Sequence, residues 1–168
     1  AVAYVASAQA YNVSATSVGV ATPVGTIDGD LMVAYVFNKN NARTITLPSG
    51  WTSAFNDRTT HNGLLIAYRI ASSEPSTRTF TVSATDGLSV SVLTFRKGSP
   101  GALSLEVGAI ARSGNLADDA PAFTSANTGI VVAYSGNEVA SAATASATGM
   151  TPADSVSVSG LNTAAFYE

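Results

Sequence analysis

The chain has 168 residues, enough for one domain, and 46% of them are hydrophobic while only 11% are charged. This balance excludes an intrinsically disordered chain, which combines low hydrophobicity with high charge, and a long coiled coil, which is rich in Glu, Lys, Arg and Leu. The formal net charge is −3, and the longest basic run is Arg96-Lys97. Because nucleic-acid phosphates are bound by clustered Lys and Arg, we expect no nucleic-acid partner.

The absence of cysteine and the short apolar runs exclude further classes of protein. The chain has no cysteine, so a disulfide framework and a thiolate metal site are both excluded. No apolar run reaches the about 18 residues that span a bilayer, and the first residues lack the basic leader of a signal peptide. We therefore expect no membrane partner and a chain made in the cytoplasm.

Polar and apolar residues alternate with a period of two along much of the chain, which predicts half-buried strands. The alternation is clearest in Thr79–Ala84, Leu88–Val92, Leu103–Val107 and Ser155–Ser159. Two further segments, Leu31–Phe37 and Leu64–Ile70, are apolar on both faces and predict central strands covered from both sides, with a second subunit as one source of that cover. We expect these two segments and Phe80–Ala84 to be the most buried strands.

Dipeptides that favour tight turns separate the strands. Asn62-Gly63 and Asp86-Gly87 suit type I′ hairpin turns. Further turns are expected at Asp28-Gly29, Lys97-Gly98, Ser113-Gly114-Asn115, Ser135-Gly136-Asn137 and Ser159-Gly160. In Val139–Ala147, alternation of Ala with hydroxyl residues favours a strand or loop over a helix. The spacing predicts an all-β fold, an antiparallel β-sandwich or jelly roll of about eight to eleven strands with little or no helix.

A weak internal repeat relates the two ends of the chain. Asp30–Tyr35 resembles Gly129–Tyr134, and Ile66–Tyr68 corresponds to Ala164–Phe166. The repeat covers about residues 28–70 and 127–168, and chance among Ala- and Val-rich strands is the other explanation.

The second copy would lack a segment corresponding to Thr77–Lys97. The turn Ser99-Pro100-Gly101 is the one candidate boundary between domains. Two layers of one sandwich fit the repeat better than two domains, so we expect a single β-sandwich domain over residues 1–168.

The single histidine, His61, is the residue that a Ser-His-Asp triad would have to use. Asp57 precedes it by four residues, but His61 directly precedes Asn62-Gly63 and is expected at a solvated hairpin tip without an oriented partner. No Gly-x-Ser-x-Gly sequence accompanies it. We therefore expect no catalytic residue, and we expect that the chain is not an enzyme.

Paired carboxylates occur at Asp28/Asp30 and Asp118/Asp119. Glycosidase chemistry needs two carboxyls held about 5–10 Å apart across a cleft, which neighbouring Asp residues in turns do not establish. Asp28-Gly29-Asp30 could supply oxygen ligands to Ca²⁺, but Asp-Gly-Asp is ordinary turn chemistry and the EF-hand spacing is absent. Glycines are spread singly, so no phosphate-binding loop is predicted. We expect no metal and no cofactor.

Trp51 is the only tryptophan, and it follows the turn Pro48-Ser49-Gly50. A Trp at a loop edge can stack on a glycan, but at such a position it more often packs over the end of a sandwich core. The core position is favoured here, with Phe55, Tyr68 or Phe80 as neighbours. Glycan stacking is the alternative.

Several segments together resemble a known group of proteins. They are Gly29-Asp30-Leu31-Met32-Val33-Ala34, Leu47-Pro48-Ser49-Gly50-Trp51-Thr52, Leu65-Ile66-Ala67-Tyr68-Arg69-Ile70-Ala71, Ser73-Glu74-Pro75-Ser76 and Thr79-Phe80-Thr81-Val82-Ser83. Their order resembles β-sandwich proteins of tailed bacteriophages, which occur as capsid decoration (cement) proteins and in tail fibres. The resemblance covers about Asp28–Arg96, with a looser similarity over Gly129–Val158. Its motifs are structural, so no catalytic residue is carried over.

This resemblance implies a non-enzymatic virion structural protein of a phage, made in the host cytoplasm and located on the capsid surface. It would be a capsid decoration protein that stabilises the head by binding the major capsid protein. The alternative is a receptor- or glycan-binding module of a tail fibre or bacterial surface adhesin.

Few charges and two strands that are apolar on both faces predict a homotrimer, since a closed ring covers apolar surface without runaway polymerisation. Local three-fold positions of a capsid lattice would suit such a ring. Residues 1–10 are the candidate docking arm, with Ala1, Val2, Tyr4 and Val5 as capsid or subunit contacts. A frayed terminus is the other interpretation.

Overall fold

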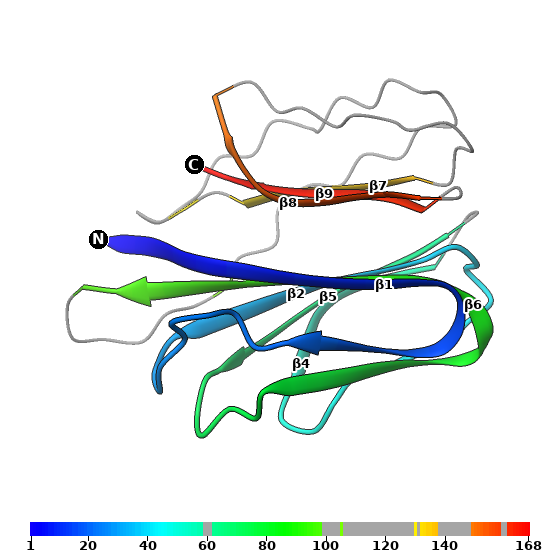
Figure 1. Cartoon of the computed structure of the whole chain (residues 1–168), viewed down its shortest axis with the longest axis horizontal. Coiled ribbons are helices and arrows are strands. Elements are labelled where there is room, and N and C mark those ends of the chain that lie inside the picture. The colour runs from blue at the N-terminus through cyan, green and yellow to red at the C-terminus, as the bar shows by residue number, and fades with distance from the viewer. Residues whose placement is uncertain (59–61, 99–104, 106–129, 131, 138–148, 159–160) are drawn as a thin grey trace.

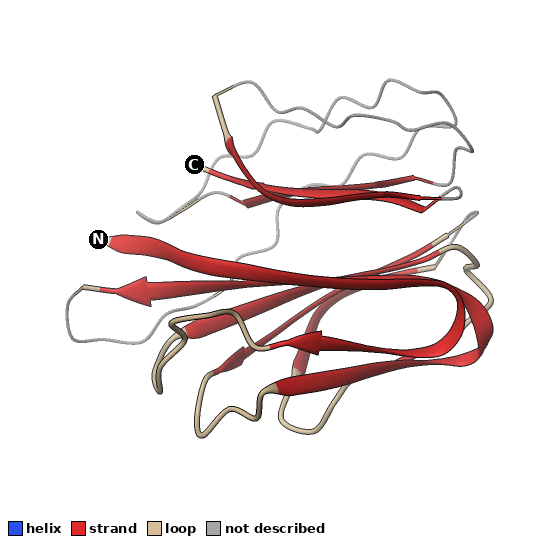
Figure 2. Ribbon diagram, viewed as in Figure 1, coloured by secondary structure: helices blue, strands red, loops and turns tan. Residues whose placement is uncertain are grey.

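The computed structural model describes residues 1–58, 62–98, 105, 130, 132–137, 149–158 and 161–168. These residues form nine strands and no helix (Figure 2). The strands are β1 (Val2–Ala21), β2 (Leu31–Asn38), β3 (Ile45–Thr46), β4 (Thr52–Asp57), β5 (Gly63–Ile70), β6 (Thr77–Lys97), β7 (Val132–Asn137), β8 (Thr151–Val158) and β9 (Leu161–Tyr167). The predicted all-β antiparallel fold is confirmed, and the finer expectation of a jelly roll stays a prediction.

The strands form two sheets that face each other (Figure 1). The larger sheet has the order β1-β6-β2-β5-β4, and β3 also pairs with β6. The smaller sheet has the order β7-β9-β8. All pairings in both sheets are antiparallel. Side chains from β1, β2 and β6 contact the smaller sheet and hold the two faces together.

The long strands β1 and β6 fold back together as one ribbon, so that its far half lies beneath the rest of the larger sheet (Figure 1). Their pairing is irregular around Ala15, which lies opposite Asp86. Asp86-Gly87 therefore lies inside β6, and the prediction of a hairpin turn there is wrong. A strand with bulges can bend without ending. The Gly87 carbonyl accepts hydrogen bonds from the Lys39 amide at 3.0 Å and the Asn38 side chain at 3.1 Å, which fix the bend against the end of β2.

Strand β2 is buried along its whole length because both of its faces are covered. Even-numbered residues from Met32 to Val36 pack in a first core against the folded-back ribbon. Odd-numbered residues from Leu31 to Tyr35 pack in a second core against the smaller sheet. The expected burial of Leu31–Phe37 is confirmed, and the cover on both faces comes from the same chain rather than from a second subunit.

The other two segments expected to be most buried are covered less completely. In Leu64–Ile70 the middle residues Leu65–Ala67 are buried, but Ile70 is 45% exposed at the end of β5. Phe80–Ala84 keeps the alternation seen in the sequence, with Phe80 and Val82 in the first core and Ala84 only partly buried. β5 is nevertheless an interior strand of the larger sheet, between β2 and β4, and its middle residues contribute to both cores.

Turn predictions have mixed outcomes. Asp28-Gly29 is a turn whose glycine has a φ of 93°, and Lys97-Gly98 ends β6. Ser135-Gly136-Asn137 is wrong as a turn because these residues belong to β7. The glycine in its middle has a packing reason, since the Phe37 ring lies 2.5 Å from where a Cβ would stand. A side chain there would force the two sheets apart.

The remaining predicted turns lie beside the described strands or outside the described residues. The Asn62-Gly63 dipeptide leads into β5, which pairs with β4 as a hairpin requires. The predictions for Ser113-Gly114-Asn115, Val139–Ala147 and Ser159-Gly160, and most of Leu103–Val107, fall outside the described residues.

The internal repeat extends to the pairing of strands. β2, β5 and β4 are neighbours in the same order as β7, β9 and β8. Residues at corresponding sequence positions pair alike: Tyr35 with Ile66 and Tyr134 with Ala165, then Thr52 with Tyr68 and Thr151 with Tyr167. Ala165 rather than Ala164 therefore corresponds to Ile66, one residue along from the match expected from the sequence.

Local irregularities recur as well. The register shifts in β4 between Ser53 and Phe55, and in β8 between Pro152 and Asp154. Each of these strands follows a glycine with a φ of 83°, Gly50 and Gly149. A shared register, bulge and turn glycine favour duplication over chance similarity.

Trp51 lies in the first core, as the sequence predicts. It is 8% exposed, and its ring meets Phe80 edge-on with centroids 5.6 Å apart. We predict that Trp51→Ala lowers the free energy of unfolding by about 3–5 kcal/mol, because it leaves a cavity in a packed core. Urea denaturation measures this loss. The control Tyr11→Ala, at a side chain that is 47% exposed, should cost less than about 1 kcal/mol. Equal losses would contradict the core position.

Candidate functional site

The carboxylates of Asp28 and Asp30 are both bonded within the chain. Asp30 is 2% exposed. Its Oδ1 accepts a hydrogen bond from Arg96 Nε at 2.8 Å, and its Oδ2 accepts from Arg96 Nη2 at 2.7 Å and from the Ile27 amide at 2.9 Å. Asp28 accepts from the Ser73 amide at 2.7 Å. A calcium ion at this turn would have to displace Arg96 from Asp30.

Arg96 also determines the ionisation of Asp30. Burial by itself raises the pKa of this carboxyl, but the hydrogen bonds from Arg96 and Ile27 and the charge of Arg96 outweigh burial, so the pKa is lowered. The ionised pair ties the turn before β2 to the end of β6. Its role in this structure is to hold that turn in place.

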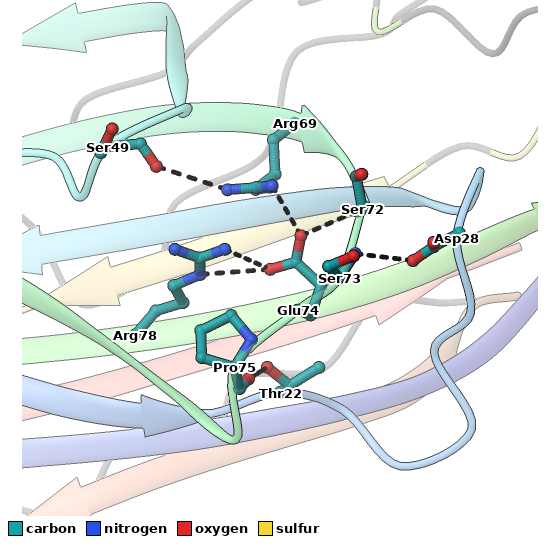
Figure 3. Close-up of polar contacts among 9 residues, drawn as sticks. All are labelled: Thr22, Asp28, Ser49, Arg69, Ser72, Ser73, Glu74, Pro75 and Arg78. Carbon is teal, nitrogen blue, oxygen red and sulfur yellow. Dashed lines mark hydrogen bonds and ion pairs between the residues drawn. The ribbon is translucent and has the colours of Figure 1, made fainter.

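Arg69 and Glu74, from two of the segments that carry the phage resemblance, meet Arg78 in one ion-pair network (Figure 3). Glu74 lies between two guanidinium groups, with Oε1 2.7 Å from Arg69 Nη2 and Oε2 2.8 Å from Arg78 Nη2. The Ser72 amide donates to Glu74 Oε1 at 3.0 Å, and Arg69 donates to the Ser49 carbonyl at 3.3 Å. The Glu74 side chain is only 6% exposed, so water screens this network weakly. It joins the turn before β4 to the ends of β5 and β6.

The turn before β4 depends on this network. Gly50 has a φ of 83°, a conformation that side chains disfavour, and Arg69 Nη1 lies 3.0 Å from where its Cβ would stand. Arg69 therefore packs directly against the turn that carries Trp51 into the first core. The Glu-Pro turn is held as well, because Thr22 donates to the Pro75 carbonyl at 2.5 Å (Figure 3).

A second polar cluster lies between the two sheets, where the sequence analysis predicted none. Ser89 and Ser91 of β6 are fully buried. Ser89 Oγ lies 3.1 Å from Thr163 Oγ1 of β9, and Ser91 Oγ donates to Asp154 Oδ1 of β8 at 2.9 Å. Gln9 of β1 donates to Ser91 at 3.3 Å. We call these residues the inter-sheet polar layer.

Alternation along β6 does place Ser89 and Ser91 on one face, and that part of the sequence pattern is correct. The smaller sheet covers this face, and no local pattern signals a cover that comes from residues more than sixty positions away along the chain. The serines therefore form hydrogen bonds to the second sheet instead of facing water.

Asp154 is the titratable member of the inter-sheet polar layer. Burial raises the pKa of its carboxyl to about 6, and the nearby hydroxyls of Ser91 and Ser7 offset part of that effect. Its Oδ2 is buried and has no hydrogen-bond partner among the described residues. The stacked rings of Tyr35 and Tyr134, with centroids 4.8 Å apart, belong to the same region. The pKa of Tyr35 is also raised, mainly by burial and to a lesser extent by the negative charge of Asp154.

Of the remaining candidate catalytic residues, the structure describes only Asp57. Asp57 ends β4, while His61, Asp118 and Asp119 lie outside the described residues. The expectation that His61 is not catalytic therefore stays a prediction.

The candidate docking segment forms the start of β1. Val2 pairs with Lys97 and Tyr4 pairs with Phe95 in β6. The Tyr4 ring also stacks on Tyr167 with centroids 4.1 Å apart. Ala1, Val2, Tyr4 and Val5 therefore belong to the rim of the sheet, and a partner would meet them there rather than on a detached arm.

Among the described residues, no three His, Asp or Glu side chains are grouped as a metal site would require. No helix in the same part of the chain is long and apolar enough to cross a membrane. No protein-family model, curated protein or solved structure matches the chain.

We predict that Glu74→Gln lowers the free energy of unfolding by about 2–4 kcal/mol, because two partly buried arginines then lose their shared anion. Thermal and urea denaturation measure the loss. Glu168→Gln, at the exposed end of the chain, removes the same charge and should have an effect below about 0.5 kcal/mol. Equal midpoints for the two variants would contradict the importance of this network.

We predict that the chain loses stability as pH rises from about 4 to about 6. The folded-state pKa of Asp154 is about 6 against an ordinary value of 3.8, so over this range the folded chain holds a proton that the unfolded chain has released. The loss is on the order of 2 kcal/mol. The pKa of Asp30 is lowered, so its contribution is complete above its ordinary value of 3.8 and does not cancel this loss.

Asp154→Asn tests the assignment, because the amide keeps an acceptor for Ser91 and cannot ionise. Urea denaturation at a series of pH values should show a flatter profile for this variant and a higher stability near pH 7 than for the unchanged chain. A profile unchanged by the substitution would show that another group titrates.

Proposed function

We propose that this chain is a non-enzymatic structural protein of a phage virion, a capsid decoration (cement) protein that stabilises the head by binding the major capsid protein. The observation that supports this proposal most strongly is the arrangement of the resembling segments. Arg69 and Glu74, both in these segments, join strand ends through an ion pair, and Gly50 allows the turn that carries Trp51 into the core. The residue types that resemble phage β-sandwich proteins therefore have structural roles in this fold.

Composition supports the same proposal. Only 11% of the residues are charged, and small uncharged side chains allow a particle component to pack closely against its neighbours. The proposed location is the surface of the phage capsid, after synthesis in the host cytoplasm. No cofactor, nucleic acid or membrane forms part of the proposal.

The proposed assembly is a homotrimer seated on the capsid lattice. One argument for it is weaker than the sequence suggests, because β2 is covered on both faces within one chain. The remaining support is the low charge and the three-fold positions at which the resembled decoration proteins sit. Light scattering on the purified chain measures the assembly directly, and a stable monomer at micromolar concentration would contradict it.

The alternative is a receptor- or glycan-binding module of a tail fibre or bacterial surface adhesin. In this alternative Trp51 would stack on the glycan, but its ring packs in the first core and is 8% exposed. The exposed surface of the Trp51 ring is too small for a glycan to stack on it, so the decoration role has the stronger support.

We predict that phage particles containing this chain carry it in hundreds of copies. Stain intensity of its 16.9 kDa band, relative to the major capsid band, measures the copy number. Heads stripped of the chain should break at a lower temperature, and adding back the purified chain should restore their stability. A handful of copies per particle would favour the tail-fibre alternative, and presence only on a bacterial surface would contradict the virion role.

A further inference from the structure

Strand β1 forms one rim of the larger sheet. It is the first strand in the sheet order, and among the described residues it pairs on one side only, with β6. Figure 1 shows it running along the sheet from the N-terminus before the ribbon folds back. The outer side of such a strand presents a row of backbone N–H and C=O groups that an added strand can pair with.

The usual protections of an exposed strand are missing from the middle of this rim. All 20 residues of β1 lack charge, and none is a proline. From Ala6 to Asn12 the strand keeps an unbroken register with β6, and its irregularities lie before and after this stretch. Proteins commonly blunt exposed edges with lysine, proline, bulges or very short strands. We call residues 6–12 the edge segment, and the exposed Tyr11 lies within it.

Strand direction indicates what pairs with the edge segment. β1 and β4, the two edges of the larger sheet, run in the same direction, because every neighbouring pair between them is antiparallel. Joining copies in a ring around an axis along the strands would place β1 beside β4 in parallel. β4 is also shorter, is irregular between Ser53 and Phe55, and ends at Asp57.

Two copies of β1 related by a two-fold axis meet in antiparallel orientation, which is the more stable pairing per residue. A two-fold contact uses the same surface twice and closes on itself. The edge segment has no charge, so the two copies bring no like charges together there, although each chain has a net charge of −3. These features favour a second copy of this chain as the occupant of the edge.

We propose that the edge segment pairs antiparallel with the edge segment of a second copy, so that the two larger sheets become continuous across a two-fold axis. This contact does not depend on the proposed capsid role. If the homotrimer also forms, the same contact would join subunits of neighbouring trimers.

Light scattering and hydrogen exchange on the full chain test the pairing together. We expect a mass of two copies, or of an even multiple, with outward amides of residues 6–12 becoming more protected as concentration rises. Tyr11→Lys places a charge on the edge segment at a side chain that is 47% exposed, and it should raise the dissociation constant at least about tenfold. Val24→Lys adds the same charge at a loop residue that is 89% exposed and should leave association unchanged.

Circular dichroism and unfolding midpoints establish that the variants fold, and Asn12→Lys, at another exposed residue of the edge segment, replaces Tyr11→Lys if that variant is destabilised. A monomer at all concentrations overturns the pairing, as does an oligomer that the lysine variants leave intact. Protection of residues 6–12 that is independent of concentration also overturns it, because the edge would then be covered within one chain. A trimer insensitive to these variants would overturn this contact and still support the homotrimer.

Discussion

Burial of β2 on both faces requires two covering layers, and the chain supplies them from different parts of its sequence. The folded-back ribbon of β1 and β6 covers one face, and the smaller sheet covers the other. The bend at Asp86-Gly87, the close approach of Phe37 to Gly136 and the burial of Ser89 all follow from this arrangement. An apolar strand of this kind loses its stability if either layer is lifted away, since hydrophobic burial is roughly proportional to the area removed from water.

The sequence predicts those features that depend on local pattern. The alternation of polar and apolar residues predicts the strands, and the apolar run Leu31–Phe37 predicts its own burial. The turn before Trp51 predicts that the indole ring packs in the core. Asp86-Gly87 and Ser135-Gly136-Asn137 have the composition of turns, but partners far along the chain extend the strands through them. Local composition indicates which backbone conformations cost little free energy, whereas pairing with distant strands determines which conformation the chain adopts.

In the candidate sites, too, local motifs can be predicted from the sequence but contacts between distant residues cannot. Glu-Pro and Pro-Ser-Gly-Trp are recognisable in the sequence, but the ion pairs between Arg69, Glu74 and Arg78 become visible only when three strand ends are brought together. The inter-sheet polar layer could not be predicted, because its serines look like the solvent-facing half of an ordinary strand. A carboxyl at position 154 likewise gives no local sign that it is buried.

Several contacts between the two sheets join residues at corresponding positions of the internal repeat. Tyr35 and Tyr134 correspond in sequence and stack on each other, and Phe37 contacts its own counterpart, Gly136. Contacts between corresponding residues are what a two-fold relation between two similar units produces. The units differ where β8 has Asp154, because the corresponding residue of β4 is Phe55.

The central claim is that one chain covers both faces of β2. Hydrogen exchange of the amides of Leu31–Asn38, measured on the chain diluted until light scattering shows a monomer, tests it most directly. Slow exchange is expected in that monomer, because opening β2 still requires the unfolding of a single chain. Fast exchange of these amides in a monomer that remains folded by circular dichroism would contradict the claim, since the cover of β2 would then come from another subunit.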